Sequence, residues 1–274
     1  MKITFLGGGN MATALIGGLV AAGTPTREFR IVEPAPAQQD RLAARFAGIG
    51  IFGEATAGAV QGADVVVLAV KPQHMRMAAQ AIAPHVRDVP VVMTIAAGTR
   101  IGDLSRWLGG HERIVRAMPN TPALVGAGIT GVYAPAAVDA AGRALATRVL
   151  EAAGEVIWVD EEARLDAVTG VSGSGPAYAF YFLESLEEAA RQLGFTQGDA
   201  RKLAYATFAG AIKLAQASSE APATLRAQVT SKGGTTERGI GVLDEHQVKA
   251  TFVVAVKAAA ARATELGDAL GKDA

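Results

Sequence analysis

The 274-residue chain contains no cysteine, which excludes disulfide bonds, thiolate metal sites and a cysteine nucleophile. Aromatic residues make up only 5% of it, and its 26 basic and 26 acidic residues cancel. No basic run with interleaved aromatic residues occurs, so binding to nucleic acid or to an anionic membrane is not expected. No apolar run reaches the roughly 18 residues that a membrane span needs. Because the chain also shows no charged leader or cleavage site, we expect a soluble cytoplasmic protein.

Histidine is scarce as well, which argues against metal and catalytic-triad chemistry. The four histidines lack metal-ligand spacing, and neither an H-E-x-x-H nor a G-x-S-x-G motif occurs. We therefore expect no metal site. A reaction whose difficult step is carried out by an organic cofactor suits this chain better.

Strand-like and helix-like segments alternate up to about residue 160, which indicates a doubly wound α/β domain. Residues 64–70 are apolar after the leading aspartate, as is typical of a strand buried on both faces of a parallel sheet. The expected strands are Lys2–Leu6, Phe29–Val32, Ile49–Phe52, Asp64–Val70, Val91–Ile95, Arg113–Ala117, Ile129–Tyr133 and Val156–Val159. The expected helices are Asn10–Ala22, Ala37–Ala47, Gln73–His85, Arg100–Leu108 and Ala137–Ala152. We predict a Rossmann-type domain over residues 1–160.

After Asp160 long helical patterns predict a C-terminal all-α domain of residues 161–274. The expected helices are Pro176–Leu193, Gln197–Ser218 and Glu245–Leu266, with Gly194 and Gly267 as C-terminal caps. Residues 251–261 of the last helix are nearly uncharged on every side, which indicates burial on most sides. A small domain buries several such helices only with difficulty, so we expect it to pack against a partner subunit.

The first dozen residues combine an apolar strand, a glycine cluster and the start of a helical pattern. The spacing Gly7-x-Gly9-x-x-Ala12 matches the motif that places a helix N-terminus against a pyrophosphate. Gly7 would make the turn, Gly9 would allow close approach of the phosphates, and Ala12 would allow close packing of helix and strand. In a chain with 32 glycines the spacing alone is weak evidence. Its place between strand and helix favours a dinucleotide site over a βα turn that binds nothing.

Three later strand ends carry distinctive loops on one edge of the predicted sheet, where open α/β sheets bind ligands. Lys71 precedes Pro72 at one end, either at the rim of a cofactor cleft or simply in solvent. Small residues at 96–98, Ala-Ala-Gly, leave room for a flat ring, or merely reflect an alanine-rich chain. Residues 119–122, Pro-Asn-Thr-Pro, form a rigid turn around Asn120. Together the three ends favour a site on this edge.

Two glycine-rich segments of the helical part are also candidates for binding. Residues 172–178, Ser-Gly-Ser-Gly-Pro-Ala-Tyr, form a flexible entry to a long helix that Ser174 could cap. Residues 230–236, Thr-Ser-Lys-Gly-Gly-Thr-Thr, precede another helix, and their backbone N–H groups suit a carboxylate. The more common alternative for both is an ordinary helix N-cap with a glycine turn.

Taken together, these segments resemble the pyrroline-5-carboxylate reductases, the enzymes that complete proline biosynthesis. The resemblance covers nearly the whole chain, in order, on residues 5–12, 69–73, 96–98, 116–122, 172–178 and 230–236. It implies hydride transfer from NAD(P)H to the imine carbon of 1-pyrroline-5-carboxylate, which gives L-proline. It also implies a homodimer through interlocked helical domains, or an assembly of such dimers, and makes both glycine-rich segments expected elements of the site.

The resemblance assigns roles to residues of both domains. The pyrophosphate would bind Leu6, Gly7, Gly8, Gly9, Asn10 and Met11, and the rest of the cofactor would lie along Ala69, Val70, Lys71, Pro72, Ala96, Ala97, Gly98 and Asn120. The substrate would contact Glu220, Ser231, Gly233, Gly234, Thr235 and Thr236, with its carboxylate on backbone N–H groups of the loop. Thr236, the expected catalytic residue, would hydrogen-bond the ring nitrogen. A cyclic iminium already carries the charge that hydride neutralises, so the protein supplies mainly positioning and electrostatics.

Two residues depart from the family pattern. Lys232 stands where many members have proline, which makes the loop less rigid and adds a positive charge near the substrate carboxylate. Glu33, just after the second predicted strand, would accept hydrogen bonds from the ribose hydroxyls of NADH and repel the 2′-phosphate of NADPH. The family expectation is NADPH, whereas Glu33 suggests that NADH is used at least comparably.

Two other kinds of function fit part of the sequence. A related imine dehydrogenase or a β-hydroxyacid dehydrogenase could share the two-domain plan. The β-hydroxyacid type would carry a catalytic lysine on an inter-domain helix, and Ala177–Leu193 contains none. A non-catalytic NADP(H) sensor that signals through its dimer would not need the Gly-Gly-Thr-Thr sequence. Cofactor oxidation on addition of 1-pyrroline-5-carboxylate would separate a sensor from the reductase.

Overall fold

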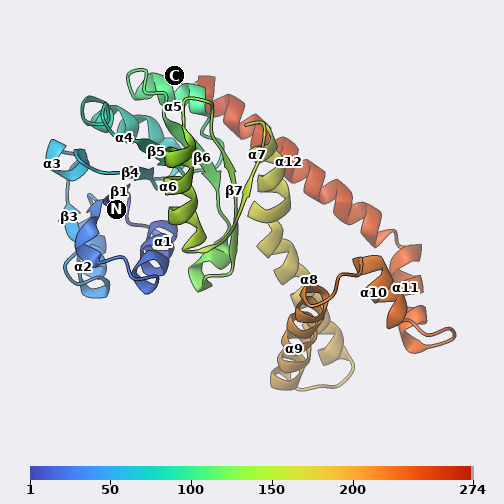
Figure 1. Ribbon diagram of the computed structural model, residues 1–274. Coiled ribbons are helices and arrows are strands. Elements are labelled where there is room, and N and C mark those ends of the chain that lie inside the picture. The colour runs from blue at the N-terminus through green and yellow to red at the C-terminus, as the bar shows by residue number, and fades with distance from the viewer. Residues whose placement is uncertain (273–274) are drawn as a thin grey trace. The chain divides into compact units, whose positions relative to one another are not determined.

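A computed structural model describes residues 1–272, and its N-terminal part is built around one eight-stranded sheet (Figure 1). The strand order is β3-β2-β1-β4-β5-β6-β7-β8, and only the β6–β7 pair is antiparallel. The direction of winding reverses between β1 and β4, and α/β sheets bind ligands at such a point. The strands are β1 (Ile3–Leu6), β2 (Phe29–Val32), β3 (Gly50–Phe52), β4 (Val65–Leu68), β5 (Val91–Thr94), β6 (Ile114–Met118), β7 (Gly128–Tyr133) and β8 (Gly154–Trp158).

Helices connect the strands and form the rest of the chain (Figure 1). Those of the N-terminal part are α1 (Asn10–Ala21), α2 (Pro36–Arg45), α3 (Ala57–Val60), α4 (Met75–Ile82), α5 (Ile101–Trp107), α6 (Ala140–Glu151) and α7 (Arg164–Val168). The later ones are α8 (Gly175–Gln192), α9 (Gln197–Gln216), α10 (Pro222–Gln228), α11 (Thr235–Glu245) and α12 (Val248–Lys272). The predicted Rossmann-type sheet with a helical C-terminal part is confirmed.

Strand β4 explains why the sheet is covered on both faces. Its residues are fully buried, and alternate ones enter different hydrophobic clusters. Val65 and Val67 pack in the cluster that includes Leu15 of α1, whereas Val66 and Leu68 pack in the one that includes Met75 of α4. A continuous apolar run is therefore required, because neither face of the strand meets water.

The chain divides into two compact units by its internal contacts. The sheet unit comprises Met1–Ser174 and the segment from Ala258 onward, and the helical unit comprises Gly175–Lys257. The sequence pattern placed the boundary after residue 160, where the last strand ends. The contacts instead group α7 with the sheet, since Leu165 is fully buried there.

Two predicted helix ends are wrong, and a third is confirmed. Gly267 lies inside α12, where a Cβ atom would stand 3.3 Å from the carbonyl oxygen of Gly98, so glycine serves close packing there rather than capping. Ser174 does not begin α8 after a flexible loop, because a π-helical turn (Thr169–Gly173) leads from α7 directly into α8; the N–H of Ser174 instead bonds the carbonyl of Thr169 at the end of that turn. Gly194, with φ +95°, does end α8, and the N–H of Phe195 bonds the carbonyl of Ala190 at 3.2 Å.

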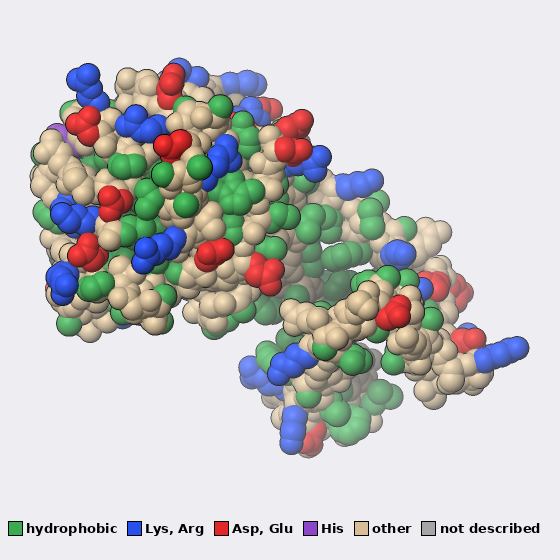
Figure 2. Space-filling view, in the orientation of Figure 1, with side chains coloured by type: hydrophobic (Ala, Val, Ile, Leu, Met, Phe, Trp, Pro, Cys, Tyr) green, Lys and Arg blue, Asp and Glu red, His purple; other side chains and the backbone are tan. Residues whose placement is uncertain are grey.

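The helical unit has a small aromatic cluster and much exposed apolar surface (Figure 2). The Phe252 ring lies 5.4 Å from that of Tyr178 and 5.6 Å from that of Phe182. Val253 and Val254, in the nearly uncharged stretch of α12, are 45% and 65% exposed in the single chain. None of the helices within residues 1–272 is long and apolar enough to cross a bilayer.

Candidate active site

The turn after β1 has the geometry that its sequence predicts. Gly7 adopts φ +94°, and its N–H bonds the carbonyl of Val32 at 2.8 Å. A Cβ on Gly7 would stand 2.7 Å from the carbonyl oxygen of Ala69, so both the conformation and the space require glycine. Ala12 is buried, as expected for close packing of α1 on the sheet.

A cavity of about 720 Å³ opens at the carboxyl ends of β1 to β4. It brings together seven of the predicted cofactor residues, which are Leu6, Gly7, Gly9, Glu33, Ala69, Val70 and Lys71. The other lining residues were not predicted from the sequence; they are Val32, Pro34, Gly53, Glu54, Ala55, His74, Met77, Ala78 and Ala81. Residues 53–55 directly follow β3, so the rule that ligands lie at carboxyl ends of strands could have found them.

Gly9 faces this cavity and fits a bound dinucleotide. It is the N-cap of α1, and a Cβ built on it would meet nothing within 4 Å. The protein itself therefore leaves free the space that a side chain would fill. Beyond Gly9, the N–H groups of Asn10 and Met11 belong to a first helical turn, where no intrahelical carbonyl is available to them. Such donors at a helix N-terminus suit a pyrophosphate.

Gly8, the middle residue of the motif, contributes through its backbone and does not line the cavity. Its N–H donates to Oε2 of Glu33 at 3.0 Å, and its carbonyl accepts from Nε2 of Gln38 at 2.6 Å. Oε1 of Glu33 accepts the N–H of Ala35, also at 3.0 Å. The glycine turn and the residues after β2 are thus joined through one carboxylate.

Three further predicted cofactor residues line a smaller cavity of about 320 Å³. Pro72, Ala97 and Gly98 face it, opposite apolar side chains of α12, Ala263, Leu266 and Leu270. Ala96, the first residue of the predicted triplet, is buried, and its N–H lies 3.3 Å from Oγ1 of Thr94. The loops after β4 and β5 therefore form a second recess within the sheet unit.

Asn120 joins two sequence motifs that lie far apart in the chain. Its side-chain oxygen accepts the N–H of Ile129 at 3.0 Å, and its amide donates to the carbonyl of Ser172 at 3.2 Å. The Pro-Asn-Thr-Pro turn is thereby fixed to β7 and to the π-helical turn. A role of Asn120 in cofactor binding stays a prediction, since both ends of its side chain have protein partners.

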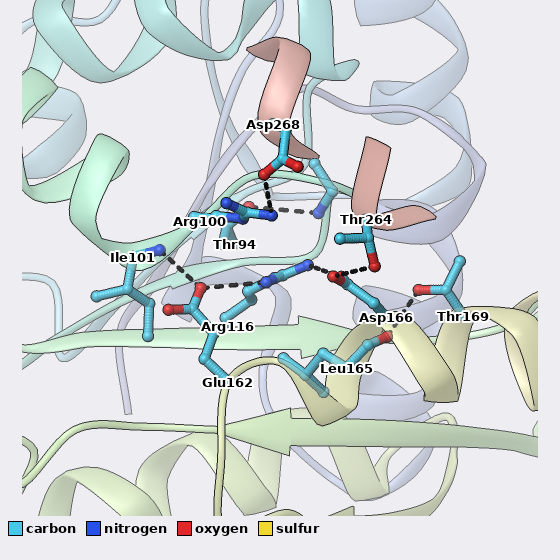
Figure 3. A network of polar contacts seen from close by, with 11 residues as sticks. Thr94, Arg100, Ile101, Arg116, Glu162, Leu165, Asp166, Thr169, Thr264 and Asp268 are labelled. Carbon is cyan, nitrogen blue, oxygen red and sulfur yellow. Dashed lines mark hydrogen bonds and ion pairs between the residues drawn. The ribbon is translucent and has the colours of Figure 1, made fainter. Parts of the chain in front are cut away.

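An ion-pair network centred on the buried Arg116 supports the sheet beside these loops (Figure 3). Arg116 of β6 bonds Glu162 at 3.1 Å and Asp166 at 3.0 Å. Glu162 also accepts the N–H of Ile101 at 2.9 Å, at the start of α5. Arg100 bonds Asp268 of α12 at 2.6 Å. These contacts hold the segment after Gly98 between β6 and the end of α12.

The loop before α11 forms a compact turn in the helical unit. Gly233 has φ +72°, and the N–H of Gly234 bonds the carbonyl of Ser231 at 3.0 Å. The N–H of Gly233 donates to Oε2 of Glu237 at 2.6 Å. Two of the three N–H groups assigned to a substrate carboxylate therefore have internal acceptors, and one of these acceptors is itself a carboxylate.

The remaining predicted residues of this unit lie at its surface. Thr235 and Thr236 are the first two residues of α11 and are exposed, as are Lys232 and Glu220. Glu220 lies between α9 and α10, and its N–H bonds Oγ of Ser218 at 3.0 Å. Within residues 1–272, no group of three or more His, Asp or Glu side chains is placed to hold a metal ion.

Two family models match the chain, one in its helical C-terminal part and one in its N-terminal sheet part. A model described as pyrroline-5-carboxylate reductase dimerisation matches residues 162–266. A model described as NADP oxidoreductase, coenzyme F420-dependent, matches residues 2–98, which contain β1 to β5.

Individual proteins of known family are similar to this chain over nearly its whole length. The pyrroline-5-carboxylate reductase of Pseudomonas aeruginosa is 44% identical over 99% of this chain and 98% of its own length. A solved structure of such a reductase from Coxiella burnetii is 39% identical, with a TM-score of 0.91 over 97% of this chain and 98% of that one. The Plasmodium falciparum pyrroline carboxylate reductase, solved with NADP bound, is 26% identical, with a TM-score of 0.86 over the same shares.

Proposed function

Since the chain belongs to the pyrroline-5-carboxylate reductase family, we propose that it reduces 1-pyrroline-5-carboxylate to L-proline with a reduced nicotinamide cofactor. The observation that carries this function is the 44% identity to the Pseudomonas aeruginosa reductase over essentially the full length of both chains. The glycine turn and the cavity beside it supply an independent physical reason for a dinucleotide.

The sheet unit holds the cofactor, which supplies the hydride when it is bound. Gly7 sets the turn, Gly9 gives the phosphates room, and the first N–H groups of α1 bind their charge. Ala69, Val70 and Lys71 line the same cavity after β4. Pro72, Ala97 and Gly98 line the smaller recess opposite apolar side chains of α12, where a flat ring could lie.

The loop before α11 binds the substrate in this proposal. The N–H of Gly233 already donates to a carboxylate, that of Glu237, which supports carboxylate binding by this loop. The substrate carboxylate would take the backbone N–H groups of Gly233, Gly234 and Thr235, and Ser231 and Glu220 would complete the pocket. The hydroxyl of Thr236 would then hydrogen-bond the ring nitrogen and orient the imine carbon.

We further propose that the active form is a homodimer, or an assembly of dimers, in the cytoplasm, where reduced nicotinamide cofactors are available. Large apolar side chains such as Phe180, Tyr181 and Val254 are more than half exposed in the single chain. Patches of this kind mark interaction surfaces. The dimerisation model that matches residues 162–266 covers the same helices.

The deciding experiment is a turnover assay with the purified protein. Addition of 1-pyrroline-5-carboxylate should oxidise the reduced cofactor and yield one L-proline for each cofactor consumed. A cofactor sensor would bind the nucleotide without turnover, and that result would reject the reductase. A β-hydroxyacid dehydrogenase would oxidise a hydroxy acid and leave the imine untouched.

A further inference from the structure

The adenosine end of the large cavity has an acidic character that the family does not lead one to expect. Glu33 follows β2 and Glu54 follows β3, and both line the cavity. The basic side chains of the lining are Lys71 and His74, which follow β4. Because β1 lies between β2 and β4, strand spacing separates these two ends by about 10 Å. The ribose position at the end of β2 therefore has Glu33 at its own strand end and Glu54 after the neighbouring strand β3, with the basic groups farther away.

Two hydrogen bonds fix the carboxylate of Glu33 at this position. Its two oxygens each accept one backbone N–H at 3.0 Å, from Gly8 and from Ala35. Every carboxylate oxygen has a second lone pair, so Glu33 can still accept two hydroxyl protons. The vicinal diol of an unmodified ribose supplies those two donors.

Apart from the N–H of Ala37 in the first turn of α2, the segment after Glu33 offers few donors to a phosphate group. Pro34 and Pro36 have no N–H, and the N–H of Ala35 is donated to Glu33. The side chains of Ala35 and Ala37 have no polar atom. The amides of Gln38 and Gln39 donate to the carbonyls of Gly8 and Glu33, at 2.6 Å in both cases. A 2′-phosphate here would meet a fixed negative charge and little to neutralise it.

We propose that Glu33 makes this enzyme select NADH over NADPH, although a family model for NADP oxidoreductases matches the same residues. This inference rests on the proposed function, because it concerns the cofactor of that reaction. A like charge in a partly buried site disfavours the wrong ligand, whereas the diol gains two charge-assisted hydrogen bonds. We expect NADH to bind about tenfold more tightly than NADPH, or better.

The test measures the binding of each nucleotide to the purified protein by calorimetry, without substrate. Wild type should bind NADH more tightly than NADPH, and the ratio of the two Kd values should shrink as salt is added, because salt screens charge. In Glu33→Gln, NADH should bind more weakly and NADPH more tightly. Glu151→Gln, an exposed carboxylate outside the cavity, is the matched control and should change neither Kd.

The outcomes separate this inference from the proposed function. Equal or tighter binding of NADPH by wild type would overturn the NADH preference and leave the reductase intact. Weaker binding of both nucleotides by Glu33→Gln would mean that Glu33 only supports the glycine turn. That result would also overturn the proposed selection of NADH by Glu33. Failure of wild type to bind either nucleotide would reject the proposed function together with this inference. If Glu33→Gln does not fold, the same two Kd values are measured for Glu33→Ser, in which NADH should likewise bind more weakly and NADPH more tightly.

Discussion

Arg116 donates a hydrogen bond to Asp166 at 3.0 Å, and the two side chains are only 4% and 10% exposed. The pair joins β6 to α7 in the interior of the sheet unit. Asp166 also accepts the hydroxyl proton of Thr264 at 3.1 Å, so the same carboxylate fixes the C-terminal part of α12 (Figure 3). One buried charge therefore connects a strand and two helices that are distant in sequence.

Replacement of Asp166 by alanine should destabilise the fold by up to about 3–5 kcal/mol, because the buried Arg116 loses one of its two carboxylate partners and keeps only Glu162. Urea unfolding at a fixed protein concentration measures this free energy. Asp160→Ala breaks the exposed pair with Arg164, whose side chains are 74% and 64% exposed, and should cost less than about 1 kcal/mol. Equal losses in the two variants would show that burial does not strengthen the network.

The glycine turn allows binding and folding to be separated. Gly9→Ala should leave the Tm of the free protein nearly unchanged, since a Cβ there meets nothing within 4 Å. It should weaken dinucleotide binding about tenfold or more, because the new methyl group occupies the space of the phosphates. Gly7→Ala should lower the Tm as well, since its Cβ would stand 2.7 Å from the oxygen of Ala69. Unchanged nucleotide binding by Gly9→Ala would contradict the placement of the pyrophosphate.

The strands and the cofactor edge were largely predictable because their signals are local. The apolar run of β4 must be buried on both faces, and the loops after strands must share one edge, so Lys71 and Glu33 were expected near Gly9. Glycines were harder to interpret, since a small residue serves a cap or a close approach equally well. At Gly267 the deciding factor is the backbone of Gly98, which comes from a distant loop.

Hydrogen-bond partners across the fold were not predictable from the sequence. Nothing local indicates that the amide of Asn120 bonds the carbonyl of Ser172, which lies 52 residues away. The carboxylate of Glu237 on Gly233 had a usable signal, because a glutamate in the third helical position commonly bonds a backbone N–H at the helix start. From the sequence, that N–H was expected to bind only the substrate.

His111 should make stability depend on pH. Burial and the nearby charge of Arg113 lower the pKa of His111 from its ordinary value of 6.5. Below about pH 6.5 the unfolded chain therefore binds a proton that the folded chain still excludes, so stability should fall as the pH drops through this range. Urea unfolding at pH 7.5 and pH 5.5, about one unit to either side of the ordinary histidine pKa, measures the change in the free energy of unfolding. His111→Gln should show a smaller loss than wild type, and an unchanged loss would place the effect elsewhere.

Thr236 should matter for turnover and not for cofactor binding. Thr236→Ala removes the hydroxyl that we assign to the ring nitrogen, and kcat should fall about tenfold or more. Because Thr236 is exposed on α11 and lies outside the cofactor cavity, the Kd of the reduced cofactor should stay the same. Thr236→Ser keeps the hydroxyl and should retain most of the activity. A kcat equal to that of wild type in Thr236→Ala would remove this residue from the mechanism.

Glu237 should compete with the substrate for the loop before α11. Its carboxylate accepts the N–H of Gly233 at 2.6 Å, so a substrate carboxylate binds that donor only after Glu237 has moved. Glu237→Gln weakens the internal bond and increases the fraction of loops that are free to bind. The KM for 1-pyrroline-5-carboxylate should fall several-fold while kcat stays unchanged, as steady-state kinetics at saturating cofactor would show. Glu245→Gln, at the other end of the same helix, should leave both constants unchanged. A raised KM in Glu237→Gln would mean instead that Glu237 supports the conformation that binds the substrate.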